Sequence, residues 1–432
     1  GSGAMPPPTL AQAVLTVHCK TMSDVRDQYE SFPYPARDPR DEAKRLITGS
    51  PSLPIEMDHC LWAGRRDWSQ PLRVLVAGGG TGDGLVQLAQ LLTNAGKPYD
   101  ITYIDLSAAS RKIAEARIAA RGLGGVQFHS GSLMDAPELG KFDYIDCCGV
   151  LHHLPDPLAG LRALRAALAP RGGLGFMVYA PYGRSGVYPL QAAFNKLYGH
   201  LPPRARLKHA KKAFAAVPET HPLRRITHLG DHNQSDAGFY DLLVHSQDQA
   251  FDVAAWTAAL TETGWALASF AQQGLYDLAR LVDVPDGMDT TTQMATAEQL
   301  RGTIKVHVGY ARAATDKAPI WQSITDRIPH LHNVPAKPMA DAVALGKIPK
   351  LRLGSEQITV NIPAAAAPLI ARIDGRKTVN ETIQSTELAP EKALRLWQKS
   401  TPRSARGVCC AIQVSPQISR FPTLFRHLKF CS

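Results

Sequence analysis

The sequence lacks several features that mark secreted, membrane-spanning and zinc-binding proteins. Its seven cysteines form no C-x-x-C pair, and two pairs of them are adjacent in the chain, which is poor geometry for a disulfide scaffold or a zinc site. No run approaches the roughly 18 uninterrupted apolar residues that a membrane span needs. Pro6–Pro8 occupy the position at which a secretory signal peptide would have its apolar segment. We therefore expect a soluble cytoplasmic protein with no membrane partner, and its scattered histidines predict no metal site.

Acidic residues are also absent after Glu391, although the whole chain has a formal net charge of +10. Basic residues continue through 392–432, so much of the positive excess is local to this end of the chain. A basic tail gives only weak support for nucleic-acid binding, and we do not expect a nucleic-acid partner.

The length of 432 residues suggests two or three folding units. The stretch Tyr29–Pro35 is aromatic and broken by proline, which indicates a helical arm followed by irregular chain. A later insertion is rich in basic residues, histidine and proline, and several prolines with few periodic apolar residues indicate a linker. The expected units are an arm (5–70), an α/β domain (71–315) with an inserted lid (186–245), a linker (316–350), a small α+β module (351–400) and a basic tail (401–432).

From Leu72 onward, short apolar runs alternate with amphipathic segments of about a dozen residues. This alternation predicts right-handed βαβ crossovers and a doubly wound, Rossmann-like parallel sheet. A ligand should lie at the carboxyl ends of its first and fourth strands. The expected strands are 72–77, 101–104, 126–129, 142–148, 174–179, 265–270 and 303–312, the last one antiparallel, with helices at 83–94, 108–121, 156–168 and 253–263.

The strongest local signal is the glycine-rich turn Gly78–Gly84, which follows the first strand. Glycine lets the backbone approach a ligand closely, and the helix that follows presents free N–H groups and the positive end of its dipole. Asp105 ends the next strand, where an acid suits both hydroxyls of a ribose. The structural alternatives are a tight turn without a ligand and a helix cap at Asp105, for which Ser107 is the better candidate.

Four segments together resemble class I S-adenosylmethionine-dependent methyltransferases: VLVAGGGTGDG, YIDLS, the loop Gly131–Asp135 and FDYIDCCGVLHHLPDP. The resemblance covers residues 72–182 and implies a seven-stranded sheet, S-adenosyl-L-methionine as cofactor and S-adenosyl-L-homocysteine as product. The sequence departs from the commonest first motif, E/D-x-G-x-G-x-G, because Ala77-Gly78 stands where an acid is common. Backbone carbonyls at Ala77 and Cys148 would then replace the usual contact to the cofactor's amino group.

The resemblance also implies roles for individual residues. The glycine turn would cradle the methionine part of the cofactor, Asp105 would bind the ribose, and Leu106 and Leu133 would enclose the adenine. The segment from Cys148 onward would pass the sulfonium, and two tyrosines of the arm would close over the cofactor. The implied cofactor-binding residues are Gly78, Gly79, Gly80, Thr81, Gly82, Asp105, Leu106, Ser107, Gly131, Ser132, Leu133, Cys148, Gly149, Val150, Tyr29 and Tyr34.

Methyl transfer from a sulfonium requires an acceptor held about 3 Å from the methyl group with water excluded. An amine or hydroxyl acceptor must also lose a proton, so a base is useful. His153, Tyr179 and Tyr182 follow strands four and five and are the candidate catalytic residues. Packing within the loop or the core is the alternative for His153 and Tyr179, and for His245 and Asp248 we favour a helix cap over substrate binding.

The flanking segments bear a looser resemblance to a bacterial subgroup of methyltransferases with an added C-terminal module, some of which methylate protein lysines. The segments concerned are Tyr29–Pro35, Tyr240–Asp248 and 369–379. This favours nitrogen or oxygen of a protein or peptide side chain as the acceptor, with a small-molecule methyltransferase as the alternative. The module could equally seal the sheet edge or form a homodimer.

Two readings from other classes stay open. An NAD(P)-binding Rossmann oxidoreductase is disfavoured because the glycines do not follow the G-x-G-x-x-G spacing. A non-catalytic scaffold that only binds the cofactor is disfavoured by the intact cofactor motifs.

Overall fold

The computed structural model describes residues 21–320, 323–331, 334–347, 350–354, 356–359, 361–400 and 412–415. The beginning of the predicted arm and most of the predicted basic tail lie outside the described residues. Among the helices of the described part, every one is too short or too polar to traverse a lipid bilayer.

A seven-stranded sheet forms the centre of the molecule, in the order β3-β2-β1-β4-β5-β7-β6. Strands β1 to β5 are parallel to one another, whereas β7 runs antiparallel between β5 and β6. The predicted doubly wound sheet, with its antiparallel last strand, is therefore confirmed. The strands are β1 (Leu72–Ala77), β2 (Tyr99–Asp105), β3 (Val126–Ser130), β4 (Phe142–Cys148), β5 (Leu168–Tyr179), β6 (Trp265–Phe270) and β7 (Val306–Ala313).

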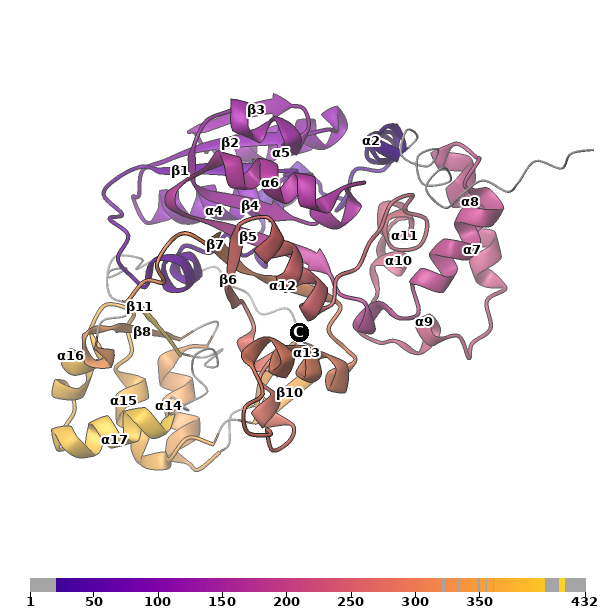
Figure 1. Ribbon diagram of the computed structural model, residues 1–432. Helices are drawn as coiled ribbons and strands as arrows, with labels where there is room; N and C mark the ends of the chain where they lie inside the picture. Colours follow the sequence, from indigo (N-terminus) through magenta and orange to yellow (C-terminus); the bar gives the residue numbers. More distant parts are fainter. Residues whose placement is uncertain are drawn as a thin grey trace, which may run out of the picture.

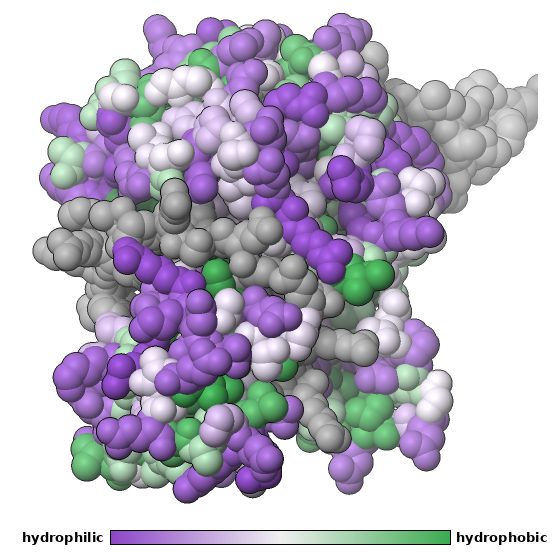
Figure 2. Space-filling model, turned by 90° about the vertical axis from the view of Figure 1, so that its left-hand side faces the viewer, coloured by the Kyte–Doolittle hydropathy of each residue, from purple (hydrophilic) through white to green (hydrophobic). Residues whose placement is uncertain are grey.

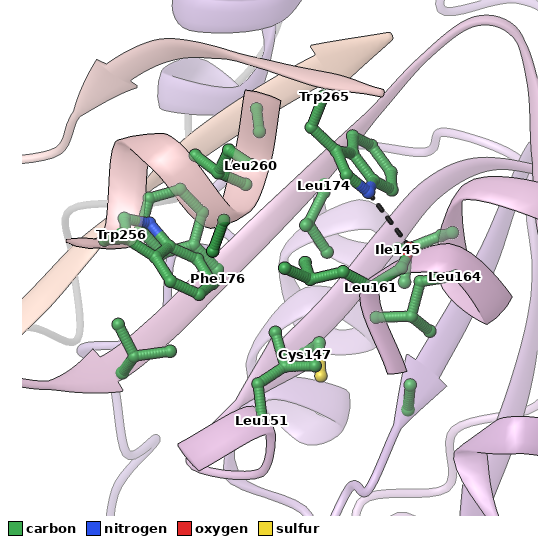
Figure 3. Packing of buried hydrophobic residues seen from close by; sticks show 14 of the residues in the cluster. Ile145, Cys147, Leu151, Leu161, Leu164, Leu174, Phe176, Trp256, Leu260 and Trp265 are labelled. Carbon is green, nitrogen blue, oxygen red and sulfur yellow. Dashed lines mark hydrogen bonds between the residues drawn. The ribbon is translucent and has the colours of Figure 1, made fainter. Parts of the chain in front are cut away.

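Helices cover both faces of the sheet, and each face has its own apolar cluster. On one face α4 (Asp83–Asn94) and α5 (Ala108–Ala120) pack against β1 and β2. On the other, α6 (Pro157–Ala167) and α12 (Val253–Glu262) pack against β4 and β5. Figure 3 shows this second cluster, in which the Trp265 indole N–H donates to the carbonyl oxygen of Leu161 over 3.0 Å. Each large side chain buried here contributes about 1.5–3 kcal/mol to stability.

The N-terminal arm is more regular than predicted, and buried ion pairs join it to the sheet domain. The fully buried guanidinium of Arg117 pairs with Glu42 at 2.6 Å and with Asp83 at 2.7 Å, and Arg37 pairs with Asp83 at 2.6 Å. Removing one partner of such a buried pair costs about 3–5 kcal/mol. The arm contains α2 (Thr21–Ser31), η1 (Pro39–Ala43), α3 (Pro54–Met57) and η2 (Asp58–Trp62).

The insertion predicted after the fifth strand is a group of helices with an apolar cluster of its own. Figure 1 shows it beside the sheet, with α2 of the arm next to it. Its helices are α7 (Tyr188–Tyr198), α8 (Pro203–Ala215), α9 (Pro222–Arg225), α10 (Asp231–Gln234) and α11 (Asp236–Leu243).

The sheet domain also contains short helices in its loops. They are η3 (Leu133–Glu138), η4 (Leu151–His153), η5 (Tyr182–Arg184), η6 (Gln273–Leu275) and η7 (Leu278–Arg280).

The C-terminal region differs from the expected division into linker and module. The predicted linker contains β8 (Ile328–Leu331) and α14 (Ala336–Ala344), and α14 packs into the same apolar cluster as the helices after residue 362. This helix was not predicted, because prolines flank it and its buried face consists of only Met339, Ala340 and Val343. The remaining elements are α13 (Thr290–Arg301), η8 (Ile324–Asp326), β9 (Lys350–Leu353), β10 (Glu356–Thr359), η9 (Ala364–Ala366), α15 (Ala367–Ala371), α16 (Val379–Gln384), α17 (Pro390–Ser400) and β11 (Ile412–Ser415).

Two further expectations need correction. The fifth strand begins at Leu168 rather than at 174, because the chain through Pro170 stays extended and pairs with β4 across a register shift. Helix α13 was not expected, since its sequence is mostly polar and only Ala297 and Glu298 are buried. Figure 2 shows one face of the molecule on which polar residues predominate and apolar ones form small separate patches.

Candidate active site

The glycine turn after β1 adopts a backbone that other residues rarely take. Gly78, Gly80 and Gly82 have φ angles of 71°, 51° and 95°. A Cβ atom on Gly78 would lie 2.5 Å from the side chain of Val150, in the segment after β4. The turn therefore needs glycine both for its φ angles and for its close contact with the neighbouring strand end.

The carboxylate of Asp105, at the end of β2, is held by two backbone N–H groups. Its Oδ2 accepts from Gly80 N over 2.7 Å and its Oδ1 accepts from Ser107 N over 2.8 Å. Burial raises the pKa of Asp105, while these two hydrogen bonds act against the rise. Each oxygen keeps a further lone pair that can accept a second hydrogen bond.

Three other residues of the predicted cofactor set have structural partners. Ser107 is the N-cap of α5, as expected, and its hydroxyl accepts from Ser110 N over 3.1 Å. Ser132 forms a capping box with Asp135 at the start of η3. Leu133 is buried in the apolar cluster beneath α6. Contacts of these residues with adenine stay a prediction.

The arm lies over the glycine turn. The hydroxyl of Thr81 donates to the carbonyl oxygen of Pro35 over 2.8 Å, and a Cβ atom on Gly80 would lie 3.2 Å from the carbonyl oxygen of Tyr34. The carboxylate of Glu30 accepts from the backbone N–H of Ala109 at the start of α5 over 3.3 Å. Of the two tyrosines predicted to close over the cofactor, Tyr34 therefore lies directly at the turn and Tyr29 does not.

A second group of side chains lies at the other side of the loop after β4, and we call it the proton cluster: the half-buried Tyr29 and the buried His153, Tyr179, Asp241 and His245. The Tyr29 hydroxyl donates to Asp241 Oδ1 over 3.1 Å and lies 3.3 Å from His245 Nε2. The Tyr179 hydroxyl donates to Asp241 Oδ2 over 2.9 Å. The rings of His153 and His245 stack with centroids 3.8 Å apart and an angle of 14° between their planes.

Hydrogen bonds to the backbone of Gln247 determine the tautomer of each of the two stacked histidines. His153 Nδ1 lies 2.8 Å from the carbonyl oxygen of Gln247, which can only accept, so this nitrogen carries the hydrogen. Gln247 N donates to His245 Nδ1 over 3.1 Å, so in His245 the hydrogen is on Nε2. Burial lowers the pKa of His245 well below its usual value, which keeps it neutral. His153 Nε2 thus carries a lone pair for which the described residues provide no hydrogen-bond donor.

Nitrogen and oxygen atoms of His153, Asp241 and His245 lie within 4.8 Å of one another, a distance that would also suit a metal ion. However, a histidine binds a metal through a lone pair in its ring plane, and two nearly parallel stacked rings cannot both point at one ion. The assigned hydrogen on His245 Nε2 acts against coordination in the same way. The arrangement is better suited to moving a proton.

The preference for helix caps at His245 and Asp248 is wrong. His245 belongs to the proton cluster, and Asp248 accepts from Gln191 over 2.9 Å and pairs with Arg184 at 3.4 Å. The guanidinium of Arg184 also lies 3.5 Å from the ring centroid of Tyr179. The helices on either side are capped by other residues.

Of the three predicted catalytic residues, the structure brings two together. His153 and Tyr179 meet in the proton cluster with ring centroids 5.5 Å apart. The hydroxyl of Tyr182 lies instead 3.4 Å from Gln299 Nε2 on α13. Asp241 and Arg184 were missed, although Asp241 lies one helical turn before His245 in a segment that the sequence had singled out.

A doubly wound sheet with a glycine turn after its first strand and a half-buried carboxylate at the end of its second is typical of nucleoside-binding α/β proteins. A family model described as a methyltransferase domain matches residues 75–174. Demethylmenaquinone methyltransferase of Geobacillus kaustophilus is 31% identical over 94 residues, which is 22% of this chain and 39% of that protein. The chain thus carries a methyltransferase domain, and its similarities support the class I S-adenosylmethionine-dependent methyltransferase family.

Two further comparisons reach beyond this domain. An uncharacterized protein of Synechococcus sp. is 31% identical over 264 residues, so the match spans 60% of this chain but only 62% of that relative. Among solved structures, PKMT2 from Rickettsia typhi in complex with AdoHcy superposes with a TM-score of 0.56 over 81% of this chain and 73% of that chain, at 14% identity. At this identity the likeness establishes the shared fold.

Proposed function

We propose that the chain is an active methyltransferase that transfers a methyl group from S-adenosylmethionine to an amine nitrogen of a protein or peptide side chain. The observation that carries this proposal is the free lone pair on His153 Nε2, held in a buried cluster on the same loop that contacts the glycine turn. A base at that place can take the proton that an attacking amine must lose.

The residues of the cofactor side fit the donor. The glycine turn would hold the methionine part, and Asp105, already fixed by two N–H groups, would accept from the ribose hydroxyls. When bound, the cofactor supplies an activated methyl group on a sulfonium. The arm segment over the turn would exclude water from it.

The charge balance of the acceptor side favours a cationic amine over a hydroxyl. Asp248 pairs with the buried guanidinium of Arg184, whereas no lysine or arginine among the described residues pairs with the buried carboxylate of Asp241. A buried charge is strongly unfavourable unless a partner arrives, and an ammonium group would supply that partner. Burial raises the pKa of Asp241, because desolvation disfavours its charged form.

In the proposed reaction the ammonium group is held by Asp241 and gives one proton to His153 Nε2. The freed nitrogen lone pair would then accept the methyl group that the bound sulfonium supplies, with the neutral thioether S-adenosylhomocysteine as the leaving group. The carbonyl oxygen of Gln247 stabilises the protonated ring through the hydrogen on Nδ1. Tyr29 and Tyr179 keep the carboxylate of Asp241 in position.

A macromolecular acceptor is favoured by the way in which the site is assembled. Its residues come from the arm, the sheet and the insertion, and the insertion carries the exposed basic residues Arg204, Lys208 and Lys212 on one side of α8. A small-molecule acceptor of secondary metabolism is the second candidate.

The test is to incubate the protein with methyl-labelled S-adenosylmethionine and a cell extract, and then to separate proteins from metabolites. Label on protein amines that is lost with His153→Gln supports the proposal. Label only in small molecules contradicts the protein acceptor, and calorimetry that shows binding of NADH but not of S-adenosylhomocysteine contradicts the activity itself.

A further inference from the structure

The helices α7 and α8 of the insertion form a surface of one charge sign. Residues 188–218 contain six lysine or arginine residues and no aspartate or glutamate. On α8 the side chains of Arg204, Lys208 and Lys212 are exposed, and none of the three forms an ion pair with another described residue. Because residues four positions apart lie on one side of a helix, these side chains form a row about 12 Å long, which we call the basic row.

A solvated helix face with no partner is the competing explanation for the basic row. However, protein surfaces usually intersperse both signs, and a surface of one sign attracts partners of the opposite charge. The neighbouring Lys211 shows that a cation of α8 can find an acid within the insertion, because it pairs with Asp236 at the start of α11. The basic row has no such acid among the described residues, so its charge is available to a partner.

The basic row lies on the outer side of a helix that supports the proton cluster. Helix α8 contacts α2, which carries Tyr29, and α11, which carries Asp241 (Figure 1). On its inner side, Leu207 belongs to the same apolar cluster as Phe32 and Tyr240, whose rings stack with centroids 5.2 Å apart. A partner that binds the basic row therefore lies next to the elements that form the acceptor side of the site.

We propose that the basic row binds an acidic segment of the acceptor protein, so that the methylated lysine lies in an acidic sequence. This inference deepens the proposed function and rests on it. The acceptor side calls for a positive group at Asp241, and the basic row calls for negative groups nearby. A protein segment with a lysine and several acids supplies both, whereas a nucleic acid or an anionic lipid surface supplies only negative charge.

The width of α8 sets the spacing between the lysine and the acids. A helix with its side chains is about 10–12 Å across, and an extended chain advances about 3.3 Å per residue. A chain with its amine at Asp241 thus reaches the basic row after about four residues or more.

The experiment measures the binding of two fluorescent peptides by anisotropy, with the full chain and S-adenosylhomocysteine present. Each peptide has one central lysine, and the residues about four to seven positions from it are glutamate in the first peptide and glutamine in the second. The glutamate peptide should bind about tenfold more tightly at low salt, because three exposed ion pairs each contribute roughly a factor of two. This preference should decrease as the salt concentration rises. Equal affinities of the two peptides would overturn the inference.

The preference should disappear when Arg204→Glu, Lys208→Glu and Lys212→Glu are combined, and a preference that survives in this variant would contradict the inference. If the variant does not fold, glutamine at the same three positions gives the same decision.

The matched control combines Arg65→Glu, Lys112→Glu and Lys347→Glu, which change the net charge equally at exposed positions elsewhere. This control should keep the preference. Its loss in both variants would mean that the net charge of the protein, and not the basic row, attracts the peptide.

Competition and methylation assays separate the remaining outcomes. If single-stranded RNA or phosphatidylglycerol vesicles displace the glutamate peptide more effectively than unlabelled peptide does, the basic row serves another kind of partner and the inference is wrong. Binding of the glutamate peptide through the basic row, without transfer of a labelled methyl group to its lysine, would refute the proposed function and leave the basic row as a binding surface for acidic segments.

Discussion

The two halves of the site are built in different ways. The cofactor half uses neighbours along the chain and backbone groups, such as the N–H groups of Gly80 and Ser107 that hold Asp105. The proton cluster joins side chains that are 212 and 216 positions apart, since Tyr29 of the arm meets Asp241 and His245 of the insertion. The cofactor half therefore depends on local motifs, whereas the acceptor half exists only when the arm and the insertion are folded onto the sheet.

The largest expected effect is a loss of kcat without a loss of cofactor affinity, which would separate the two halves of the site. His153→Gln removes the free basic nitrogen and should lower kcat by about 10²- to 10⁴-fold, the usual contribution of a general base. The affinity for S-adenosylhomocysteine, measured by calorimetry, should not change, because His153 forms no part of the glycine turn.

The matched control for that variant is the adjacent histidine. Neither ring nitrogen of His152 has a hydrogen-bond partner among the described residues, and its ring lies 3.9 Å from that of Tyr179. His152→Phe keeps an aromatic ring there and should retain most of the activity. Equal losses of kcat in both variants would mean that His153 acts through packing and not as a base.

A smaller effect is expected from a substitution in the cofactor half. Asp105→Ala removes the carboxylate that would accept two hydrogen bonds from the ribose hydroxyls, and it should weaken S-adenosylhomocysteine binding about a hundredfold. Asp100→Ala, an exposed acid on the same strand, is the control and should leave binding unchanged. With saturating cofactor, the kcat of Asp105→Ala should approach that of wild type, and a persistent loss of kcat would contradict a binding role.

The smallest effect concerns stability. Burial lowers the pKa of His152 and His245 well below the ordinary value of 6.5. Below pH 6.5 the unfolded chain binds protons that the folded protein does not, so the free energy of unfolding should decrease as the pH falls. Each histidine contributes up to about 1.4 kcal/mol per pH unit. Urea denaturation between pH 7 and pH 5.5 measures this slope.

His245→Gln should make that slope shallower by one histidine's share, while His209→Gln, on the exposed side of α8, should not. An unchanged slope in His245→Gln would show that His245 takes up a proton as readily in the folded protein as in the unfolded chain.

The sequence alone predicted the sheet well and located the glycine turn and Asp105 at its strand ends, because these features lie in short segments. Each strand is a run of apolar residues, and Gly78–Gly84 and Asp105 each follow directly from one. It predicted the proton cluster poorly. In the sequence, Asp241 and Arg184 resemble ordinary surface residues, because only the folded insertion brings them together. The sequence of α13 is polar and did not predict that the Tyr182 hydroxyl would contact this helix. Helix α14 was taken for linker because its apolar face is short and bordered by prolines.

The most direct test of how the two halves work together is a crystal structure of the protein with S-adenosylhomocysteine bound. The account predicts that the ribose hydroxyls donate to Asp105 and that the sulfur atom faces the cluster of Tyr29, His153 and Asp241. A ribose bound away from Asp105, or a sulfur atom separated from His153 by packed protein, would contradict it.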